Sequence, residues 1–407
     1  MFSERERQLI RRLAGEVAQC AHSQENVDKK KRWIEHNAMR SREPMVLAYF
    51  ERSWEEIIPP ETLETQSPLL REVELELRKK LYQHRYVKDD AVVEDVYRMR
   101  AVYDDHFDWG MHPQRRETGT RGGTYEVVPV ITCEEDVALL KSKCHDWDFD
   151  DAETQRRLDA LNEVFGDLLP VRPSIPFYTS SIIFQLVPLY GLAELMTDLI
   201  LEPERIHTIM TFMTDSLLHA FQRLEKEGRI ISNNNGIFLP SGSFGFSDEL
   251  KQEDQGPFLL SDLWGFADTQ EFTDVSAEMW REFVFPYQKK LLKQFGLVYY
   301  GCCEKMDQKL DDILQLPNLR KVSVSPWTDI HLAAEKIGSK AIYCRKPNPS
   351  QVIYGFHPDQ TREDLTQLKQ TAGDCYLEVV LKDLHTCNGH PEHVLQWVEL
   401  AKSTLRA

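Results

Sequence analysis

The chain has 407 residues, of which 42% are hydrophobic and 28% are charged, as in an ordinary globular protein. A chain of this length forms one large domain, or one domain with an extension, and needs no disulfide or structural metal to bury a core. Its formal net charge of −17 repels phosphate backbones, which argues against a nucleic-acid partner.

The first segment, Met1–Arg12, is rich in charge and lacks the apolar stretch of a secretory signal. No apolar run approaches the ~18 residues that a membrane span needs. We therefore expect a cytoplasmic protein with no membrane partner. Its eight cysteines are then reduced thiols, and neighbouring cysteines become candidates for metal binding or catalysis.

Residues 1–100 read mainly as helix, because Glu4–Ala18 and Leu69–His84 carry apolar residues at three- and four-residue spacing. The more apolar Arg42–Tyr49 is either a short strand or a buried turn. These features predict an N-terminal helical extension over residues 1–100 that packs on a second domain, residues 101–407.

From about Tyr125, short β-rich runs alternate with amphipathic helices, a pattern typical of parallel strands with helical crossovers. In the second half, strands are predicted at Gly296–Tyr300, Leu319–Ser325, Lys340–Cys344 and Cys375–Leu381, and a last helix at Pro391–Leu405. No glycine-rich phosphate loop follows a strand, which argues against an open dinucleotide-binding sheet. Polar residues gather just after the strands, where the active sites of barrels lie. The fold class predicted is α/β, a (β/α)8 TIM barrel with an N-terminal helical extension.

Two groups of possible zinc ligands follow predicted strands. Tyr300 is followed by Cys302, Cys303 and Glu304, and the last strand is followed by Asp383, His385 and Cys387. Thiolates, imidazoles and carboxylates are the ligands that zinc prefers, and the loops after barrel strands converge on one mouth. The two groups are therefore candidates for one zinc site with an open position. Alternatively, the cysteines are small apolar fillers, and one of Cys302 and Cys303 points into the barrel wall.

Other charged residues are candidates for substrate binding. Arg345 can hold a carboxylate or phosphate bidentately with Lys346 as a point charge beside it, or both belong to rim salt bridges. His106 lies in an acidic and aromatic segment that lines a pocket or simply packs. Asp262 lies near another predicted strand end, where it contacts a ligand or supports the barrel.

The order of several motifs resembles that of the uroporphyrinogen decarboxylase superfamily over about residues 170–405. Leu186–Leu201 resembles its helical entry segment, Asp262–Gly265 its aspartate–glycine strand end, and Met279–Pro286 its Phe-x-x-Pro helix. Lys346–Pro349 falls where the superfamily has its Asn-x-x-Pro loop. The resemblance implies a (β/α)8 barrel and a possible homodimer.

The two branches of that superfamily imply different chemistry. The decarboxylases use no metal and hold substrate carboxylates with an N-terminal arginine-rich loop, which has no match here. The corrinoid-dependent methyltransferases bind zinc through a His-x-Cys strand end and a cysteine in the last strand loop. The corresponding positions here are Tyr300–Cys302 and Cys387, so Tyr300 replaces the histidine.

The methyltransferase branch therefore implies zinc bound by Cys302 and Cys387 with His385 or Glu304. Asp383 and Tyr300 are then the catalytic candidates, and substrate is bound by the residues Arg345, Lys346, Asp262 and His106. The expected reaction moves a methyl group between a small molecule and the cobalamin of a corrinoid-binding partner protein, as in demethylation during anaerobic metabolism. Two alternatives stay open: a metal-free decarboxylase or lyase acting on an acidic substrate, and a non-catalytic ligand-binding barrel.

Overall fold

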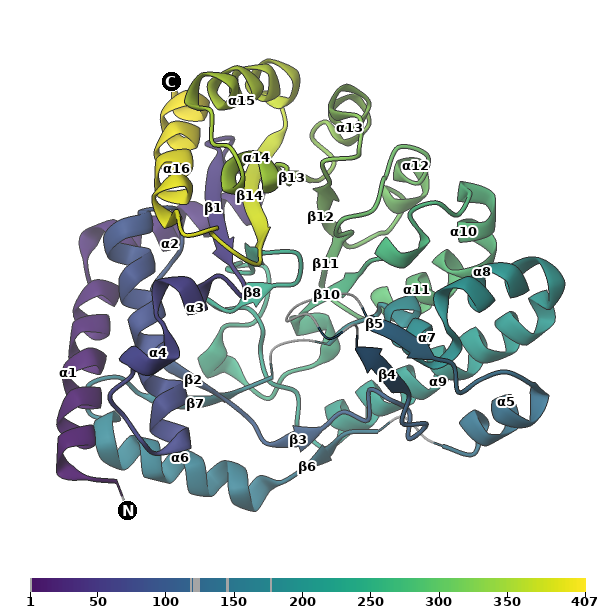
Figure 1. The fold of residues 1–407 in the computed structure, drawn as a ribbon, viewed down its shortest axis with the longest axis horizontal. Helices are drawn as coiled ribbons and strands as arrows, with labels where there is room; N and C mark the ends of the chain where they lie inside the picture. The colour runs from purple at the N-terminus through teal and green to yellow at the C-terminus, as the bar shows by residue number, and fades with distance from the viewer. Residues whose placement is uncertain (1, 118, 120–124, 144–145, 176–177) are drawn as a thin grey trace.

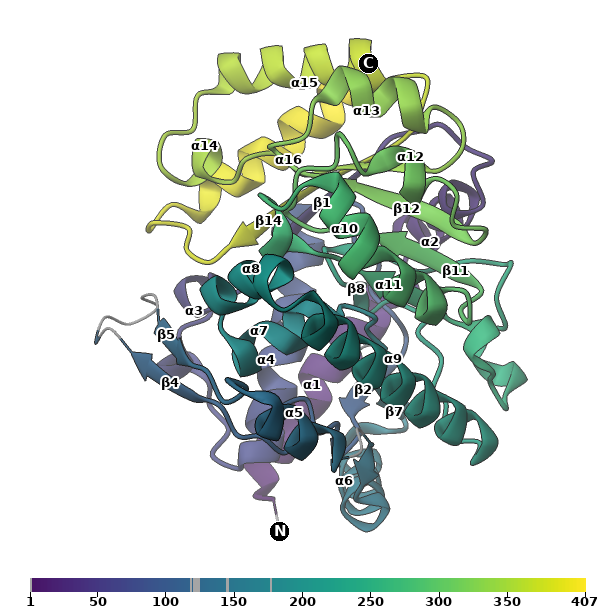
Figure 2. The ribbon, with the colours of Figure 1, turned by 90° about the vertical axis from the view of Figure 1, so that its right-hand side faces the viewer.

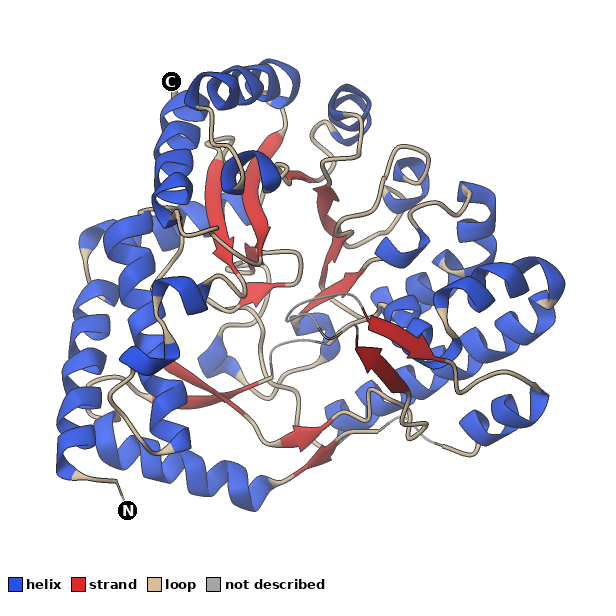
Figure 3. Ribbon diagram, in the orientation of Figure 1, coloured by secondary structure: helices blue, strands red, loops and turns tan. Residues whose placement is uncertain are grey.

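The computed structural model describes residues 2–117, 119, 125–143, 146–175 and 178–407. At its centre is a six-stranded parallel sheet with the order β1-β14-β13-β12-β11-β10. The strands are β1 (Met45–Phe50), β10 (Trp264–Ala267), β11 (Leu297–Tyr300), β12 (Leu319–Val324), β13 (Ile342–Arg345) and β14 (Tyr376–Leu384). Figure 3 shows the sheet curling, with helices around its outer side. The predicted strands of the second half are thus present.

The sheet does not close into a barrel of eight strands among the residues that the structure describes. β2 (Tyr97–Arg100) and β7 (Val171–Ser174) pair with each other in a separate parallel ribbon. Among the described residues, a single bridge between Thr179 and Phe266 extends the sheet beyond β10. The α/β class and a TIM-like curled parallel sheet are therefore confirmed. The predicted closed (β/α)8 barrel is corrected to an open one, because β2 and β7 pair with each other and not with the strands of the central sheet.

The helices that follow the strands of the second half cover the outer side of the sheet (Figure 1). They are α10 (Ala277–Phe283), α11 (Phe285–Leu292), α12 (Leu310–Ile313), α13 (Ile330–Ile337), α14 (Ser350–Ile353), α15 (Pro358–Ala372) and α16 (Pro391–Arg406). In the perpendicular view of Figure 2, α13, α15 and α16 lie at one end of the molecule, and α1 and α6 lie at the other.

The part of the chain before residue 245 is richer in helix. Its helices are α1 (Glu4–Ala21), α2 (Gln24–Asn37), α3 (Trp54–Ile57), α4 (Pro68–Tyr82), α5 (Glu134–Lys141), α6 (Asp151–Phe165), α7 (Ile182–Tyr190), α8 (Leu192–Leu201) and α9 (Pro203–Lys226). Its antiparallel pairs are β3 (Tyr103–Asp104) with β6 (Asp148–Phe149), β4 (Gln114–Glu117) with β5 (Tyr125–Val128), and β8 (Phe238–Leu239) with β9 (Ser243–Phe244).

Contacts cross the predicted boundary at residue 100. β1, inside the expected extension, pairs along its length with β14 near the end of the chain. In addition, Leu13 of α1, Leu77 of α4 and Leu161 of α6 share one buried core, which crosses the boundary. The first hundred residues therefore build part of the sheet as well as a helical flank.

Successive side chains along a strand point to opposite faces of the sheet, so they pack alternately into an outer and an inner core. Val298 and Tyr300 of β11 face the outer core beneath the helices. Tyr299 faces an inner core, which also contains Trp33 of α2 and Phe244 of β9. The concave side of the sheet is therefore filled by α2 and the β8–β9 hairpin.

The inner face carries a buried ion pair. Nζ of Lys321 lies 2.9 Å from Oε2 of Glu378, and both side chains are fully buried. Lys321 also donates to Oγ of Ser243 at 2.5 Å and to the carbonyl of Phe244 at 3.2 Å. The imidazole of His36 lies 3.8 Å from the same carboxylate. The inner face therefore combines this ion pair with the apolar side chains of the inner core.

Within the described residues, no single helix combines the length and the apolar composition needed to cross a membrane. The consecutive helices α7 and α8 meet that test only when taken together, and the pair is bent by 100°.

Candidate active site

Two thiols, a lysine and an aspartate meet at the carboxyl ends of β11 and β14. We call Cys302, Cys303, Lys382 and Asp383 the thiol–lysine cluster. The chain turns sharply after β11 at Gly301, whose φ is +94°, and a Cβ there would lie 2.1 Å from Cε of Met306. A side chain is strained at this φ, so glycine is favoured at the turn, which directs the two cysteines that follow.

The ammonium of Lys382 joins the cluster. Its Nζ lies 3.3 Å from the sulfur of Cys302, 3.3 Å from the sulfur of Cys303 and 2.9 Å from Oδ1 of Asp383. The two sulfurs are 3.6 Å apart, and the sulfur of Cys303 lies 3.5 Å from Oδ2 of Asp383. Cys302 and Lys382 are buried, whereas Cys303 and Asp383 are partly exposed. The reactive side chains therefore open toward solvent through Cys303.

Electrostatics distinguish the two thiols. The hydrogen bond between them lowers the pKa of Cys303 and raises that of Cys302 well above its usual range. The ammonium of Lys382 also lowers the pKa of Cys303, against the opposing effects of burial and of Asp383. Burial alone would lower the pKa of Lys382, but the two thiols and Asp383 raise it. The cluster thus favours a thiolate at Cys303 beside a charged lysine.

A buried pair of carboxyl groups lies next to the cluster. Glu304 accepts hydrogen bonds from the backbone N–H groups of Cys302 at 2.7 Å and Thr269 at 2.9 Å. Asp268, just after β10, has a pKa raised well above its usual range, first by burial and then by the charge of Glu304. Burial and the neighbouring Glu304 thus favour the protonated form of Asp268.

The structure does not assemble the predicted zinc ligands. No three of the described residues Cys302, Glu304, His385 and Cys387 bring ligand atoms within 4.8 Å of one another. Cys387 is buried in the outer core, where its backbone N–H donates to the carboxylate of Glu56 at 3.0 Å. Both oxygens of Glu304 already accept backbone hydrogen bonds. The residues expected to hold zinc therefore do not fit that ion as a set.

The other ligand of the predicted set, His385, lies on the rim of the cluster. Its Nδ1 is 3.2 Å from Oε2 of Glu51, at the end of β1. Glu51, Asp383 and His385 form one of two groups in the described chain whose ligand atoms are close enough to share a cation. The second group is His390, Glu392 and His393, at the start of α16.

Tyr300, a predicted catalytic residue, faces away from the cluster. Its hydroxyl donates to Oε1 of Gln288 at 2.6 Å, and its ring packs edge-on to Trp280 under the outer helices. Successive residues of a strand point to opposite faces, so Tyr300 cannot share the inner face with Tyr299. The expected role of Tyr300 in place of the family histidine is corrected accordingly.

Arg345 and Lys346 also point in opposite directions. Arg345 donates to the carbonyl of Ser325 at 2.5 Å and lines a cavity under α15. Lys346 points inward and is buried, with Nζ 2.9 Å from the sulfur of Cys344 and 3.3 Å from the carbonyl of Gly242. The two cations therefore do not form one anion-binding site.

The two remaining candidates for substrate binding do not join the cluster. Asp262 precedes β10, so it lies at the amino-terminal edge of the sheet, where it pairs with Lys251 at 3.1 Å. Its carboxylate also accepts the backbone N–H of Leu259 at 2.8 Å. His106 follows β3 and pairs with Asp148 of β6 at 2.8 Å. Asp262 was expected near a strand end, and it lies before β10 rather than after it. A role of either residue in substrate binding stays a prediction.

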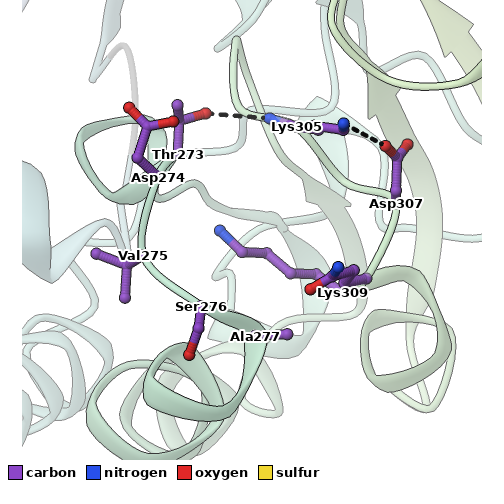
Figure 4. A pocket seen from close by; sticks show the side chains of 9 residues that line it. Thr273, Asp274, Val275, Ser276, Ala277, Lys305, Asp307 and Lys309 are labelled. Atoms are coloured by element: carbon purple, nitrogen blue, oxygen red, sulfur yellow. Dashed lines mark hydrogen bonds and ion pairs between the residues drawn. The ribbon is translucent and has the colours of Figure 1, made fainter.

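Two cavities adjoin the carboxyl edge of the sheet. One of about 250 Å³ lies between the loops after β10 and β11, where Thr273–Ala277 face Lys305 and Asp307 (Figure 4). Lys305 and Asp307 are paired at 3.2 Å across its wall. The other, of about 310 Å³, lies beneath α15. None of the described residues lining these two cavities belongs to the cluster, so Cys303 meets solvent only through its own partly exposed side chain.

The fold and the cluster define a class of protein: an α/β protein with a curled parallel sheet and reactive groups after its strands. No protein-family model matches the chain, and no curated protein matches it in sequence. Among solved structures, the chain is similar to a methyltransferase from Methanosarcina mazei, with a TM-score of 0.52 and 12% sequence identity. The match covers 93% of this chain and 99% of that one, which shows a shared fold. Membership of the uroporphyrinogen decarboxylase superfamily stays a prediction.

Sequence reasoning missed Lys382 and selected Asp262 rather than Asp268. Lys382 shares a face of β14 with Glu378 and Val380, because side chains two residues apart in a strand point the same way. That spacing was the available signal for Lys382. For Asp268, the signal was its position directly after the buried run Trp264–Ala267.

Proposed function

We propose that this protein is a methyltransferase that moves a methyl group between a small molecule and a corrinoid-binding partner protein. The thiol–lysine cluster is its reaction centre. The observation that carries the proposal is the pairing of the Cys303 thiol with the Lys382 ammonium at the mouth of a methyltransferase-like fold. The motif order described above supports the corrinoid partner. The possible homodimer and the cytoplasmic location stay predictions.

The chain's own residues supply a nucleophile and a proton. As a thiolate, Cys303 attacks a methyl carbon: the sulfur–carbon bond forms as the bond from that carbon to its leaving atom breaks, and the leaving atom keeps the electron pair. Lys382 favours the thiolate, and Asp383 holds the ammonium in place. Attack by the acceptor on the same methyl carbon then returns the electron pair to sulfur. The partner's corrinoid supplies the cobalt that accepts or donates the methyl group.

Asp268 suits a role in proton supply. Burial and the charge of Glu304 favour its protonated form. In that form it can give a proton to a leaving group whose basicity exceeds its own. Because the predicted zinc ligands do not form a set, we derive no step through zinc.

The alternatives receive less support from the geometry. A decarboxylase or lyase that binds an acidic substrate through Arg345 and Lys346 needs both cations on one side, yet they lie on opposite faces of β13. A non-catalytic barrel was favoured by the loss of the family histidine at Tyr300. The cluster provides reactive groups without that histidine.

Methyl transfer can be tested with free cobalamin in place of the partner. The purified protein is incubated without oxygen with reduced cobalamin and, separately, methylated amines, ethers and sulfides. We expect enzyme-dependent methylation of the cobalamin by one donor class, followed by absorbance. Carbon dioxide release from a carboxylic substrate, with no methyl transfer in either direction, would contradict the proposal.

A further inference from the structure

The ammonium of Lys382 lies at the centre of the thiol–lysine cluster. Nζ lies among two sulfurs and a carboxylate, at 3.3, 3.3 and 2.9 Å, and the lysine side chain is 6% exposed. These three partners come from two strand ends that are 80 residues apart in the sequence. The fold therefore gathers soft and anionic donors around one buried cation.

The donors are spaced like the ligands of a metal ion. Around a tetrahedral zinc with sulfur at ~2.3 Å, two sulfurs lie roughly 3.8 Å apart. The sulfurs of Cys302 and Cys303 are 3.6 Å apart, and the carboxylate of Asp383 is 3.5 Å from the second of them. Zinc prefers these ligand types, but a metal ion among them would lie directly against the Lys382 ammonium, where like charges repel.

We propose that Lys382 is the built-in cation of this centre and takes the place of a metal ion between Cys302, Cys303 and Asp383. The inference rests on the proposed function only where it concerns catalysis, because the binding of a metal ion to the cluster can be measured without turnover. It explains why Cys387 is free to pack in the outer core. It also gives the two thiols their counter-charge without an ion from solution.

The nearby group of Glu51, Asp383 and His385 is the competing metal site. Its ligand atoms lie within 4.8 Å of one another, but Asp383 is already paired with Lys382. The side chain of His385 is 59% exposed and is paired with Glu51. A metal held by these residues uses no sulfur, so its spectrum differs from that of a metal bound to the cysteines.

Metal uptake in Lys382 variants tests the inference. Wild type, Lys382→Ala, Lys382→Met and Lys382→Arg are incubated with equimolar zinc or cobalt(II), then separated from free metal by gel filtration. We expect Lys382→Ala and Lys382→Met to retain about one metal ion per chain, with the cobalt–thiolate absorption band. Wild type and Lys382→Arg, which keep a cation, should retain none through sulfur. Lys382→Ala combined with Cys302→Ser should lose the gained metal.

Several outcomes would overturn the inference. One is a wild-type protein that holds zinc and shows the cobalt–thiolate band, and this measurement does not depend on whether a variant folds. Another is a wild-type protein that retains zinc without showing the cobalt–thiolate band, and that no longer retains zinc after Glu51→Ala or His385→Ala. A third is a Lys382→Met variant that melts like wild type but takes up no metal. If the protein transfers methyl groups but the Lys382 variants take up no metal, only this inference is wrong. If the variants take up metal but the protein transfers no methyl group, only the proposed function is wrong.

Discussion

Lys321→Met is expected to lower the free energy of unfolding by about 3–5 kcal/mol, because it leaves the carboxylate of Glu378 buried without its nearest counter-charge. Lys321 and Glu378 are both fully buried, and their charged atoms lie 2.9 Å apart. The same substitution removes the hydrogen bonds that Lys321 donates to Ser243 and Phe244 in the β8–β9 hairpin. Urea unfolding followed by tryptophan fluorescence measures the effect.

Two controls separate the buried charge from the loss of a side chain. The double variant Lys321→Met with Glu378→Leu should recover much of the lost stability, because no unpaired charge remains. Lys336→Met breaks the exposed pair with Asp311, whose charged atoms are 2.8 Å apart, and should cost about 1 kcal/mol or less. If Lys321→Met and Lys336→Met proved equally mild, the buried pair would not hold the inner core together.

Cys303→Ser should reduce kcat/KM for methyl transfer by about a thousandfold or more, since residues that carry the chemical step give losses of this order. A serine hydroxyl is far less acidic than a thiol, so Lys382 cannot keep it ionised at neutral pH. The substitution changes one atom of a half-buried side chain and should leave the melting temperature nearly unchanged. Steady-state kinetics on the donor found in the methyl-transfer assay provide the measurement.

The matched control is Cys20→Ser, which changes a partly buried thiol of α1 outside the cluster. It should retain wild-type kinetics. Cys302→Ser should have an intermediate effect, because a serine hydroxyl still donates a hydrogen bond to Cys303. Full activity in Cys303→Ser would exclude its thiolate as the nucleophile.

The fold was largely predictable because the spacing of apolar residues along the chain indicates which side chains are buried. The alternating strands and helices of the second half gave the parallel sheet and the approximate position of each strand. The role of β1 was not predictable to the same degree, since a short apolar run such as Arg42–Tyr49 suits a strand or a buried turn equally well. Its pairing with β14 depends on contacts more than 300 residues apart, as in Met45 with Glu378.

The site was only partly predictable, because the direction of the side chains that follow a strand depends on the residue at which that strand ends. β14 was expected to end at Leu381 but continues to Leu384, which brings Lys382 to the inner face. Pairing with β1 then shifts register before Leu384, and Asp383 has a positive φ of 60°. The loop after β14 was expected to bring Cys387 to the same mouth as Cys302. The irregularity instead leaves Cys387 in the outer core.

The most direct measurement is the pH dependence of cysteine alkylation in the wild-type protein, because it needs no knowledge of the substrate. Thiolates react and thiols do not, so each cysteine becomes reactive as pH rises through its pKa. The pKa of Cys303 is lowered, whereas burial raises that of Cys20. With iodoacetamide and mass-spectrometric mapping, Cys303 should react first, with a midpoint below the ~8.5 of an ordinary cysteine. Slower reaction of Cys303 than of Cys20, or a midpoint above the ordinary value, would contradict a thiolate centre at the mouth of this fold.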